Sequence, residues 1–312
     1  MKNKTILVTG GTGSFGRAFI DEAQKHKPRK LIVLSRDELK QYEMAKDYPD
    51  VNFLVGDTRD KDRLYRAFTN VDYVVHAAAL KQIPSCEYNP FEAIKTNVLG
   101  AQNVIEAAID RGVEKVVALS TDKAANPVNL YGATKLCSDK LFVAGNAYSG
   151  GKGTRFAVVR YGNVVGSRGS VIPYFKSLRA TGKIPITDER MSRFWITLEE
   201  AVDLVMVAFK EMHGGEVFVP KIPSMRITDL AKAVAPNCKI EIVGIRPGEK
   251  LHELMITEDD ARHTLDMGDY YIIEPEFNWW HGKHEGVSVP EGFMYSSDKN
   301  TEWLTVEKMR SI

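Results

Sequence analysis

The sequence is poor in cysteine and has no long hydrophobic run. Its three cysteines, Cys86, Cys137 and Cys238, are an odd number at wide spacing. They suit free thiols in a reducing compartment better than a disulfide framework or a zinc site. No apolar run approaches the length of a membrane-spanning helix, and the amino terminus shows no signal-peptide pattern. These features predict a cytoplasmic protein with no membrane partner.

An excess of charge of either sign is also lacking. The chain has 42 Lys and Arg residues against 41 Asp and Glu residues, a net charge of +1. This balance gives no reason to expect a nucleic-acid partner, so any phosphate binding is expected to be local. His281 and His284, in a loop-like segment beside two tryptophans, make a poor metal site, and we expect no metal site. The chain does have 312 residues with 44% hydrophobic composition, ample for a large core.

Short apolar segments alternate with amphipathic ones over the first half of the chain. The expected strands are residues 5–9, 30–34, 51–55, 73–76, 115–119 and 156–160, and the expected helices include 17–26, 39–46, 90–110 and 131–144. This alternation predicts an α/β fold with a doubly wound parallel sheet covered by helices on both faces. After about residue 167, prolines interrupt the pattern, although residues 199–212 again favour a helix.

A glycine-rich segment directly follows the first expected strand and opens the first helix. Glycines in this order permit a tight turn, let backbone amides approach a pyrophosphate and allow close packing of helix on strand. The residues expected to bind a dinucleotide here are Gly10, Thr12, Gly13, Ser14, Phe15 and Gly16. We therefore expect residues 1–166 to form a Rossmann-type dinucleotide-binding domain. Residues 167–312 are expected to form mainly a smaller, mixed α/β substrate-binding region, with some segments returning to the first domain.

The end of the second expected strand indicates which dinucleotide binds. An acidic residue there would bind the ribose 2′-hydroxyl of NAD, but this chain has Ser35, followed by Arg36 and, one turn later, Lys40. A hydroxyl and two cations suit a 2′-phosphate, so the sequence predicts NADP. Asp37 is open to two interpretations, a contact with the ribose or a cap of the next helix.

Small and polar residues follow the third and fourth expected strands. Asp57 is placed either to accept a hydrogen bond from an adenine amino group or to form a turn, and Thr58 follows it. Ala77 and Ala79 would let the dinucleotide lie against the backbone. Lys81 points to the same crevice by position, where it meets a substrate phosphate or sugar or remains an ordinary solvated lysine.

A group of titratable residues follows the fifth expected strand. If a helix opens near residue 130, Tyr131 and Lys135 lie on one face, about 5 to 6 Å apart at Cβ. Positive charge from Lys135, together with that of an oxidised nicotinamide, is expected to lower the pKa of the phenol from about 10, so that Tyr131 acts as a base towards an alcohol. Thr121 can hydrogen-bond the phenol or a substrate hydroxyl. Asp122 and Lys123 form either an acid–base pair or a surface ion pair worth about 0 to 1 kcal/mol.

Taken together, these segments resemble the inverting UDP-N-acetylglucosamine 4,6-dehydratases of the extended short-chain dehydrogenase/reductase superfamily. The matching segments are TGGTGSFG, SRDELK, HAAALK, LSTDKAANPVNLYGATK, RYGNVVGSRGSVIP, RFWITLEEA and IRPGEKLHE. The resemblance runs from about Lys4 to Met255. It implies an NADP-dependent lyase that acts on UDP-N-acetylglucosamine and serves pseudaminic acid and surface or flagellin glycan synthesis. The superfamily commonly assembles through helices that flank the sheet, so we expect a homo-oligomer.

The resemblance also implies roles for the titratable residues. Tyr131, supported by Lys135 and Thr121, takes the proton of the sugar 4-hydroxyl while hydride passes from C4 to NADP and later returns to C6. Asp122 and Lys123 remove the C5 proton and protonate the departing 6-hydroxyl. Retaining dehydratases carry Asp-Glu in place of Asp122-Lys123, so the lysine implies inversion at C5.

Substrate contacts follow from the same resemblance. The positions that match them are Asn163, Val164, Arg193, Arg246 and Glu249, beside Lys81. Two arginines suit a diphosphate. Each arginine taken alone is equally compatible with a structural ion pair.

Three other functions compete with this prediction. A UDP-sugar 4-epimerase would use the same tyrosine and cofactor but would need no acid–base pair at positions 122 and 123. A longer, membrane-anchored dehydratase that retains the C5 configuration would have spanning segments and no lysine at position 123. A non-catalytic dinucleotide-sensing regulator would not need a reactive tyrosine, so Tyr131 argues against it.

Overall fold

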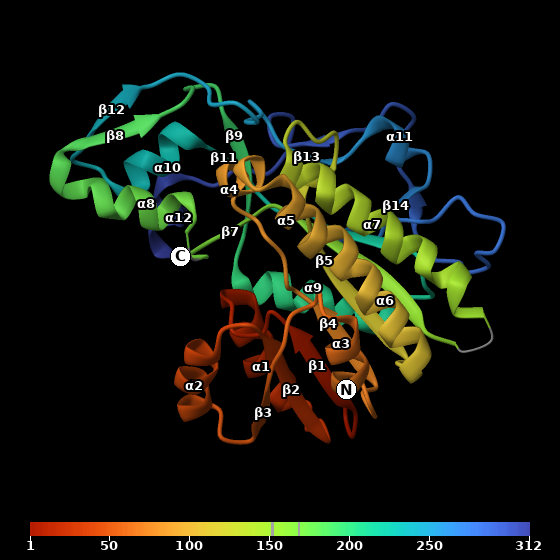
Figure 1. Ribbon diagram of the computed structural model, residues 1–312. Helices are drawn as coiled ribbons and strands as arrows, with labels where there is room; N and C mark the ends of the chain where they lie inside the picture. Colours follow the sequence, from red (N-terminus) through yellow and green to blue (C-terminus); the bar gives the residue numbers. More distant parts are fainter. Residues whose placement is uncertain (151–152, 168) are drawn as a thin grey trace.

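A ten-stranded sheet lies at the centre of the computed structural model, which describes residues 1–150, 153–167 and 169–312 (Figure 1). In spatial order the strands are β16 (Val287–Ser288), β14 (Thr264–Asp266), β15 (Tyr270–Ile273), β10 (Val217–Pro220), β6 (Arg155–Tyr161), β5 (Lys115–Thr121), β4 (Tyr73–His76), β1 (Thr5–Thr9), β2 (Lys30–Ser35) and β3 (Val51–Val55). The strands from β10 to β3 are parallel, and β15, β14 and β16 are antiparallel additions at one edge. The predicted doubly wound α/β sheet is therefore confirmed.

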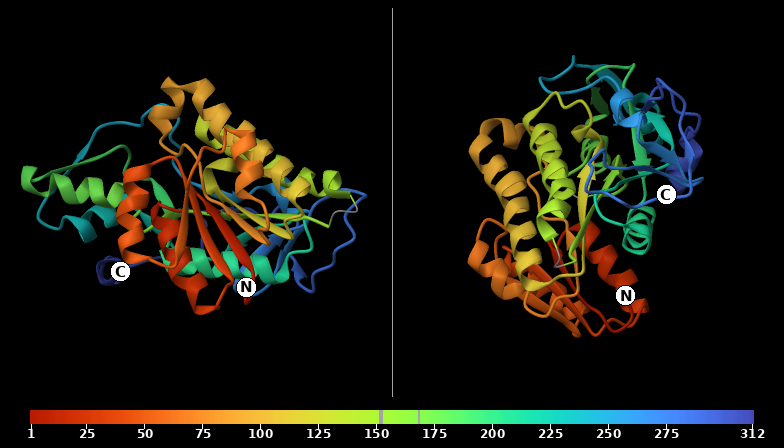
Figure 2. Two further views of the ribbon diagram at one scale, coloured as in Figure 1. Left: turned by 60° about the horizontal axis from the view of Figure 1, so that its bottom comes forward. Right: turned by 90° about the vertical axis from the view of Figure 1, so that its right-hand side faces the viewer.

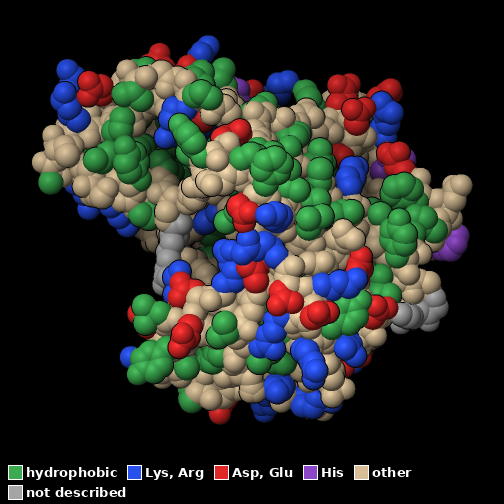
Figure 3. Space-filling view, in the orientation of Figure 1, with side chains coloured by type: hydrophobic (Ala, Val, Ile, Leu, Met, Phe, Trp, Pro, Cys, Tyr) green, Lys and Arg blue, Asp and Glu red, His purple; other side chains and the backbone are tan. Residues whose placement is uncertain are grey.

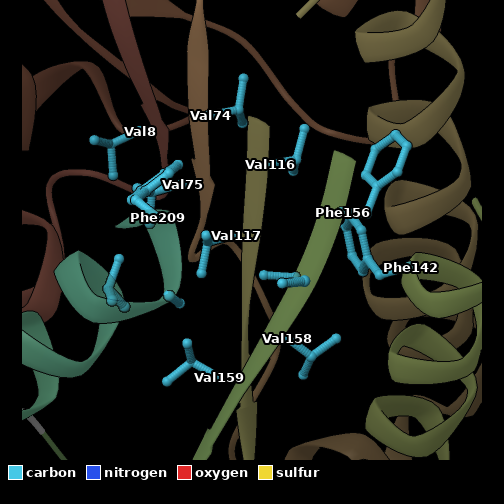
Figure 4. Packing of buried hydrophobic residues seen from close by; sticks show 14 of the residues in the cluster. Val8, Val74, Val75, Val116, Val117, Phe142, Phe156, Val158, Val159 and Phe209 are labelled. Carbon is cyan, nitrogen blue, oxygen red and sulfur yellow. The ribbon is translucent and has the colours of Figure 1, made fainter. Parts of the chain in front are cut away.

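The middle of each central strand is apolar because helices cover both faces of the sheet. Figure 4 shows side chains of neighbouring strands packed between Phe142 on one side and Phe209 on the other. The valines of this layer are Val8, Val74, Val75, Val116, Val117, Val158 and Val159, and all are fully buried. Each such side chain contributes about 1.5 to 3 kcal/mol to folding. The result is a rigid sheet whose carboxyl ends can hold functional groups in fixed positions.

Helices lie on both faces of the sheet (Figure 2). The helices are α1 (Ser14–Lys25) packed with α9 (Leu198–Glu211) on one face, α3 (Lys61–Ala67), α6 (Gly100–Arg111) and α7 (Leu130–Ser149) on the other, and α2 (Glu38–Asp47) beside β3. Two of these helices begin at the carboxyl edge of the sheet. Gly13 is the N-cap of α1, and Asn129 is the N-cap of α7. Both helix starts consequently face the same edge of the sheet.

The helix expected over residues 90–110 is interrupted. It consists of α5 (Pro90–Ile94), a π-helical segment (Lys95–Leu99) and α6, and α4 (Ile83–Tyr88) precedes it. Within the π segment, the Asn97 amide donates to the Leu80 carbonyl and to Thr134 Oγ1, and its Oδ1 accepts from the Leu80 backbone N–H. Single π-helical turns of this kind are rare and often occur at functional sites. The hydrogen bonds of Asn97 fix the segment that follows β4 against α7.

A second group of elements packs around its own apolar cluster, at the upper left of Figure 1. It comprises β7 (Asn163–Val164), β9 (Ser192–Ile196), β11 (Ser224–Arg226), β8 (Lys183–Ile186), β12 (Lys239–Ile242), α8 (Val171–Leu178), α10 (Ile227–Val234) and α12 (Val306–Ser311). A pair of short strands, β13 (Leu254–Ile256) and β17 (Tyr295–Ser296), and α11 (Glu258–Ala261) complete the fold. Strands β10, β14, β15 and β16 belong to the large sheet although they follow residue 167.

Candidate active site

A cleft of about 1660 Å³ runs from the glycine-rich turn after β1 to the second group of elements. Figure 3 shows the molecule hollowed between these two parts. The residues that the sequence predicted for cofactor, substrate and catalysis all lie in the described part of the chain, and all except Asp122 line this cleft. Their convergence depends on the sheet, because β1, β2, β3, β4, β5 and β6 all end at the same edge.

The glycine-rich turn leaves no room for a side chain at Gly10 or Gly16. Gly10 has φ +67°, and a Cβ there would lie 2.9 Å from the Ala78 backbone. A Cβ on Gly16 would collide with the Gly11 backbone, so α1 packs directly on the turn. Gly13, at the N-cap of α1, offers no capping side chain to the first amides of the helix. The first amides of α1 therefore remain available to an anion such as a pyrophosphate.

The end of β2 places two cations at the other end of this cradle. Ser35 is buried, and its Oγ accepts a hydrogen bond of 3.0 Å from Gln41 Nε2. Asp37 caps α2 by accepting from the Lys40 N–H, and its carboxylate also lies 2.5 Å from Lys40 Nζ. Of the two interpretations of Asp37, the structure thus shows the helix cap. Arg36 is half exposed and lies 3.6 Å from Asp57.

The segments after β3 and β4 form the wall beside these cations. Asp57 accepts hydrogen bonds from the Arg59 backbone and guanidinium, so it forms a turn and lines the cleft at once. Thr58 is buried at the same wall, Ala77 lies next to Gly10, and both Ala77 and Ala79 line the cleft.

Tyr131 and Lys123 are brought together by the packing of α7 on the end of β5. Asn129 caps α7 by accepting a hydrogen bond of 2.8 Å from the Gly132 N–H, which sets Tyr131 in the first turn. Gly132 packs against the carbonyl oxygen of Lys123, where no Cβ would fit. Thr121 ends β5, and its hydroxyl hydrogen-bonds the Tyr131 phenol. Lys135 lies one turn further along α7 and also lines the cleft.

Lys123 holds the centre of a buried group of charges. Its Nζ lies 2.9 Å from Asp122 Oδ1, 3.2 Å from Glu253 Oε1 and 3.4 Å from Asn163 Oδ1. Asp122 is fully buried and does not line the cleft. Its Oδ1 accepts a hydrogen bond of 3.0 Å from the Thr121 hydroxyl. The Asp122–Lys123 pair is therefore not a surface ion pair, and Lys123 is the member that faces the cleft.

Glu253 is a member of this group that the sequence did not predict. It stands one residue before β13, 130 positions from Lys123, and its carboxylate also lies 3.8 Å from Arg193 Nε and 3.8 Å from Lys250 Nζ. It closes the segment IRPGEKLHE, but no local periodicity or spacing distinguishes it from a solvent-exposed glutamate. Only the fold shows that it is buried beside Lys123.

The electrostatics of Tyr131 differ from the expectation. Burial raises the pKa of the phenol to about 12, and the largest opposing influence is the charge of Lys123, followed by the hydrogen bond to Thr121. The prediction that Lys135 lowers this pKa below about 10 is thus not met. Lys135 is itself buried, which lowers its pKa, while the charge of Asp139 opposes that shift. The cation that favours the phenolate most is Lys123.

The pKa values of Lys123, Asp122 and Glu253 are shifted in different directions. Burial alone would lower the pKa of Lys123, but Asp122 and Glu253 outweigh it and hold the lysine as an ammonium. Burial raises the pKa of Asp122, against the opposing charge of Lys123. Burial also disfavours the charged form of Glu253, but Lys123, Arg193 and Lys250 outweigh it and lower that pKa. Two carboxylates beside one ammonium thus have opposite tendencies.

The residues predicted for substrate line the far half of the cleft, beyond Lys123. Asn163 and Val164 form β7, and burial lowers the pKa of Lys81. Arg193 is buried, and its guanidinium donates to the carbonyl oxygens of Ser192, Lys250 and Leu251.

Arg246 and Glu249 form an ion pair with 2.5 Å between Nη2 and Oε1. Arg246 is largely exposed at the cleft and remains open to an anion, whereas most donors of Arg193 are already engaged.

The described residues contain no cluster of three or more His, Cys, Asp or Glu side chains placed to hold a metal ion. Within the same residues, no helix has the length and apolarity needed to cross a membrane.

Comparisons with known proteins agree with this architecture. Residues 6–275 match the family described as polysaccharide biosynthesis protein. The chain is 55% identical to a UDP-N-acetylglucosamine 4,6-dehydratase (inverting) of Campylobacter jejuni subsp. jejuni serotype O:2, over 99% of this chain and 97% of the relative. It is 45% identical to a UDP-glucose 4-epimerase of Rickettsia canadensis, over 87% of this chain and 83% of that protein.

A solved structure is also similar over the whole chain. The X-ray structure of Pen from Bacillus thuringiensis superimposes with a TM-score of 0.91 at 38% identity, covering 99% of this chain and 98% of that one.

Proposed function

The chain belongs to the polysaccharide biosynthesis protein family, and from that premise we propose that it is an NADP-dependent UDP-N-acetylglucosamine 4,6-dehydratase that inverts C5. The product would be a UDP-2-acetamido-2,6-dideoxy-4-hexulose of L-arabino configuration, used for pseudaminic acid and surface or flagellin glycans. The observation that carries the proposal is Lys123 Nζ at the cleft wall, 2.9 Å from the buried carboxylate of Asp122 and on the same cleft as Tyr131.

The cradle after β1 fits a nicotinamide dinucleotide. Gly10 and Gly16 have no space for a Cβ, and the uncapped amino end of α1 suits the pyrophosphate. Arg36 and Lys40 are placed for a 2′-phosphate, which supports NADP over NAD. When bound, NADP supplies the hydride chemistry, accepting hydride from C4 of the sugar and returning it to C6.

Tyr131 is proposed to accept the proton of the sugar 4-hydroxyl. The charge of Lys123 favours the phenolate and opposes the effect of burial, and Thr121 is the next largest influence in the same direction. Lys135 also lines the cleft, and we assign it to binding the cofactor beside the phenol. Oxidation at C4 then acidifies the C5 proton.

Lys123 is proposed to act as both base and acid in the loss of water. It first gives a proton to Asp122, so that an N–H bond breaks, an O–H bond forms and a neutral amine faces the cleft. The amine takes the C5 proton and, as an ammonium, passes a proton to the departing 6-hydroxyl, which leaves as water. Asp122 does not reach the cleft, so its part is to hold the exchanged proton. A proton from solvent then adds to the opposite face of C5, which gives inversion.

Binding of the UDP portion is assigned to the far half of the cleft. Arg246 is proposed to meet the diphosphate, and Asn163, Val164 and Lys81 the sugar, while Arg193 and Glu249 hold the wall in shape. Arg246 is paired with Glu249, but most of its side chain is exposed to the cleft, whereas Arg193 is buried and already bonded to carbonyl oxygens. A bidentate contact with phosphate suits the guanidinium of Arg246.

The identity of the product tests the proposal. Incubation with UDP-N-acetylglucosamine and NADP should yield a 4-keto-6-deoxy sugar, detected by mass spectrometry as the loss of one molecule of water. Formation of UDP-N-acetylgalactosamine instead would support a 4-epimerase, the function named for the Rickettsia relative. A protein that binds the dinucleotide and makes neither product would support the regulator.

A further inference from the structure

Glu253 takes no part in the steps above, yet its carboxylate lies closer to Lys123 than to any other cation named here, 3.2 Å from Oε1 to Nζ. Its side chain is almost fully buried. Its Oε2 has no hydrogen-bond partner among the described residues, and neither has Oδ2 of Asp122. A buried carboxylate with an unsatisfied oxygen is costly, and it persists where other interactions hold it.

The surroundings of the two carboxylates differ in charge. Three cations lie within 4 Å of Glu253, namely Lys123, Arg193 and Lys250. Asp122 has an ion pair with Lys123 and a hydrogen bond from Thr121. In a buried site, each extra cation favours the ionised carboxylate strongly. Glu253 is accordingly the carboxylate that stays charged, and Asp122 is the one that can take a proton.

The backbone holds Glu253 in place. Its N–H donates to Ser297 Oγ over 2.9 Å, and its carbonyl oxygen accepts from the Ser297 N–H over 2.8 Å. This double contact joins the start of β13 to β17, so the carboxylate has a fixed position beside Lys123. Glu253 does not line the cleft, and it therefore acts on substrate through the cations beside it that do, of which Lys123 is the nearer and Arg193 the other.

We propose that Glu253 is a positioning residue for the elimination, a permanent negative charge that holds Lys123 Nζ at the cleft wall and restores its ammonium form after each proton transfer. This inference rests on the proposed function, because it explains how Lys123 serves that reaction. The proton shuttles between Lys123 and Asp122, with one N–H bond breaking as one O–H bond forms and the reverse on return. Glu253 neither gains nor loses a proton, and no further reactant is required.

The charged groups around Lys123 come from four parts of the fold. Asp122 precedes it in the chain, Glu253 stands before β13, Arg193 lies on β9 and Tyr131 lies on α7. Arg193 and Lys250 repel the ammonium, while the two carboxylates attract it. Removal of the Glu253 charge should consequently make Lys123 easier to deprotonate.

Competitive acetylation of the full-length protein measures this directly. Acetic anhydride reacts with the neutral amine, so the labelling of Lys123 across pH, followed by peptide mass spectrometry, reports how readily it loses its proton. In Glu253→Gln the labelling curve should move to lower pH by about one to three units. At pH ~9 the rate of Lys123 acetylation should therefore rise by about tenfold or more. Glu253→Asp, which keeps the charge on a shorter side chain, should move in the same direction by less.

Glu216→Gln is the matched control. Glu216 is also buried, and it accepts from the His213 and Gly214 backbone N–H groups and pairs with His284 over 3.1 Å, away from the cleft. The Glu216→Gln variant should have the same Lys123 labelling curve as the wild-type protein. If Glu253→Gln also has the wild-type curve, the inference is overturned and Glu253 is a structural residue. If the glutamine variant does not fold, an unshifted curve in Glu253→Asp overturns it equally.

The labelling needs no substrate or turnover, which keeps it separate from the proposed function. A shifted curve in a protein that fails to dehydrate UDP-N-acetylglucosamine would remove the function and keep the charge relationship. An unshifted curve in an active dehydratase would remove the role of Glu253 alone.

Discussion

Gly132 packs against the carbonyl oxygen of Lys123 so closely that no side chain fits between them. This contact sets the first turn of α7 against the short 3₁₀ turn Asp122–Ala124, and so sets Tyr131 relative to Lys123. The proposed base of the first step and the proposed base of the second step thus share one packing contact. Their relative position is fixed by backbone atoms before any substrate binds.

Gly132→Ala tests this contact. An added methyl group must push α7 away from Lys123, which should cost about 1 to 3 kcal/mol of stability. Displacement of Tyr131 by about 1 Å should lower kcat by about a hundredfold. Thermal unfolding and steady-state kinetics measure the two effects. Gly182→Ala is the control: at φ +70° an alanine there is strained and should also lose stability, but its Cβ meets no atom within 4 Å and it does not line the cleft, so turnover should be kept.

Tyr131→Phe should abolish the reaction and leave the fold intact. The phenol oxygen is proposed to accept the 4-hydroxyl proton, and loss of a general base typically lowers the rate by about a hundredfold to ten-thousandfold. Turnover of UDP-N-acetylglucosamine gives the rate, and titration with NADP gives the affinity, which should stay within about threefold of wild type. Full turnover in this variant would exclude Tyr131 as the base.

Arg36→Ala should separate the two dinucleotides. The guanidinium is proposed to meet the 2′-phosphate, so its loss should raise the KM for NADP by about tenfold to a hundredfold, or about 1.5 to 3 kcal/mol. The KM for NAD should change little. Lys46→Ala is the control, because Lys46 lies over the Tyr42 ring, 4.6 Å from its centroid, and does not line the cleft. Equal losses for both dinucleotides would contradict the proposed NADP preference.

His76 should make the fold sensitive to acid. The ring is buried at the end of β4, with Nδ1 2.8 Å from Thr9 Oγ1, and burial followed by the charge of Lys135 lowers its pKa to about 3. The unfolded chain, with a histidine pKa of about 6.5, binds a proton that the folded chain refuses. Stability from this group is therefore present above pH ~6.5 and is lost as pH falls towards ~3.

The expected loss between pH ~7 and pH ~5 is about 2 kcal/mol. Urea unfolding at these two pH values measures it in the wild type and in His76→Asn, which keeps a polar group near Thr9 but does not titrate. The variant should lack this part of the pH dependence. The same slope in both proteins would show that His76 is not the group responsible.

Much of the fold could be predicted because its signals are local. Apolar β-branched runs locate the central strands within one or two residues, and the glycine-rich turn marks the junction of β1 and α1. The π-helical segment could not be predicted, since Asn97 widens the turn through contacts with Leu80 and Thr134, which are distant in sequence. Strands β14 to β16 are short and join the sheet at its edge, where the sequence pattern is weak.

The candidate site divides in the same way. Spacing on one helix was enough to place Tyr131 and Lys135 on α7, because helical geometry is local. The charge that acts most on Tyr131 comes instead from Lys123, and the second carboxylate beside Lys123 is Glu253. Such pairings depend on which segments the sheet brings together, and the residues on either side of each position in the sequence do not indicate them.

The hydrogen at C5 tests the central claim most directly, because Lys123 is proposed to remove one proton there and a proton from solvent to replace it on the other face. The wild-type protein, incubated in D₂O with UDP-N-acetylglucosamine and NADP, should give a 4-keto-6-deoxy product that carries deuterium at C5 in the inverted configuration, as read by NMR. A product with the original hydrogen at C5, or with the original configuration, would contradict the account.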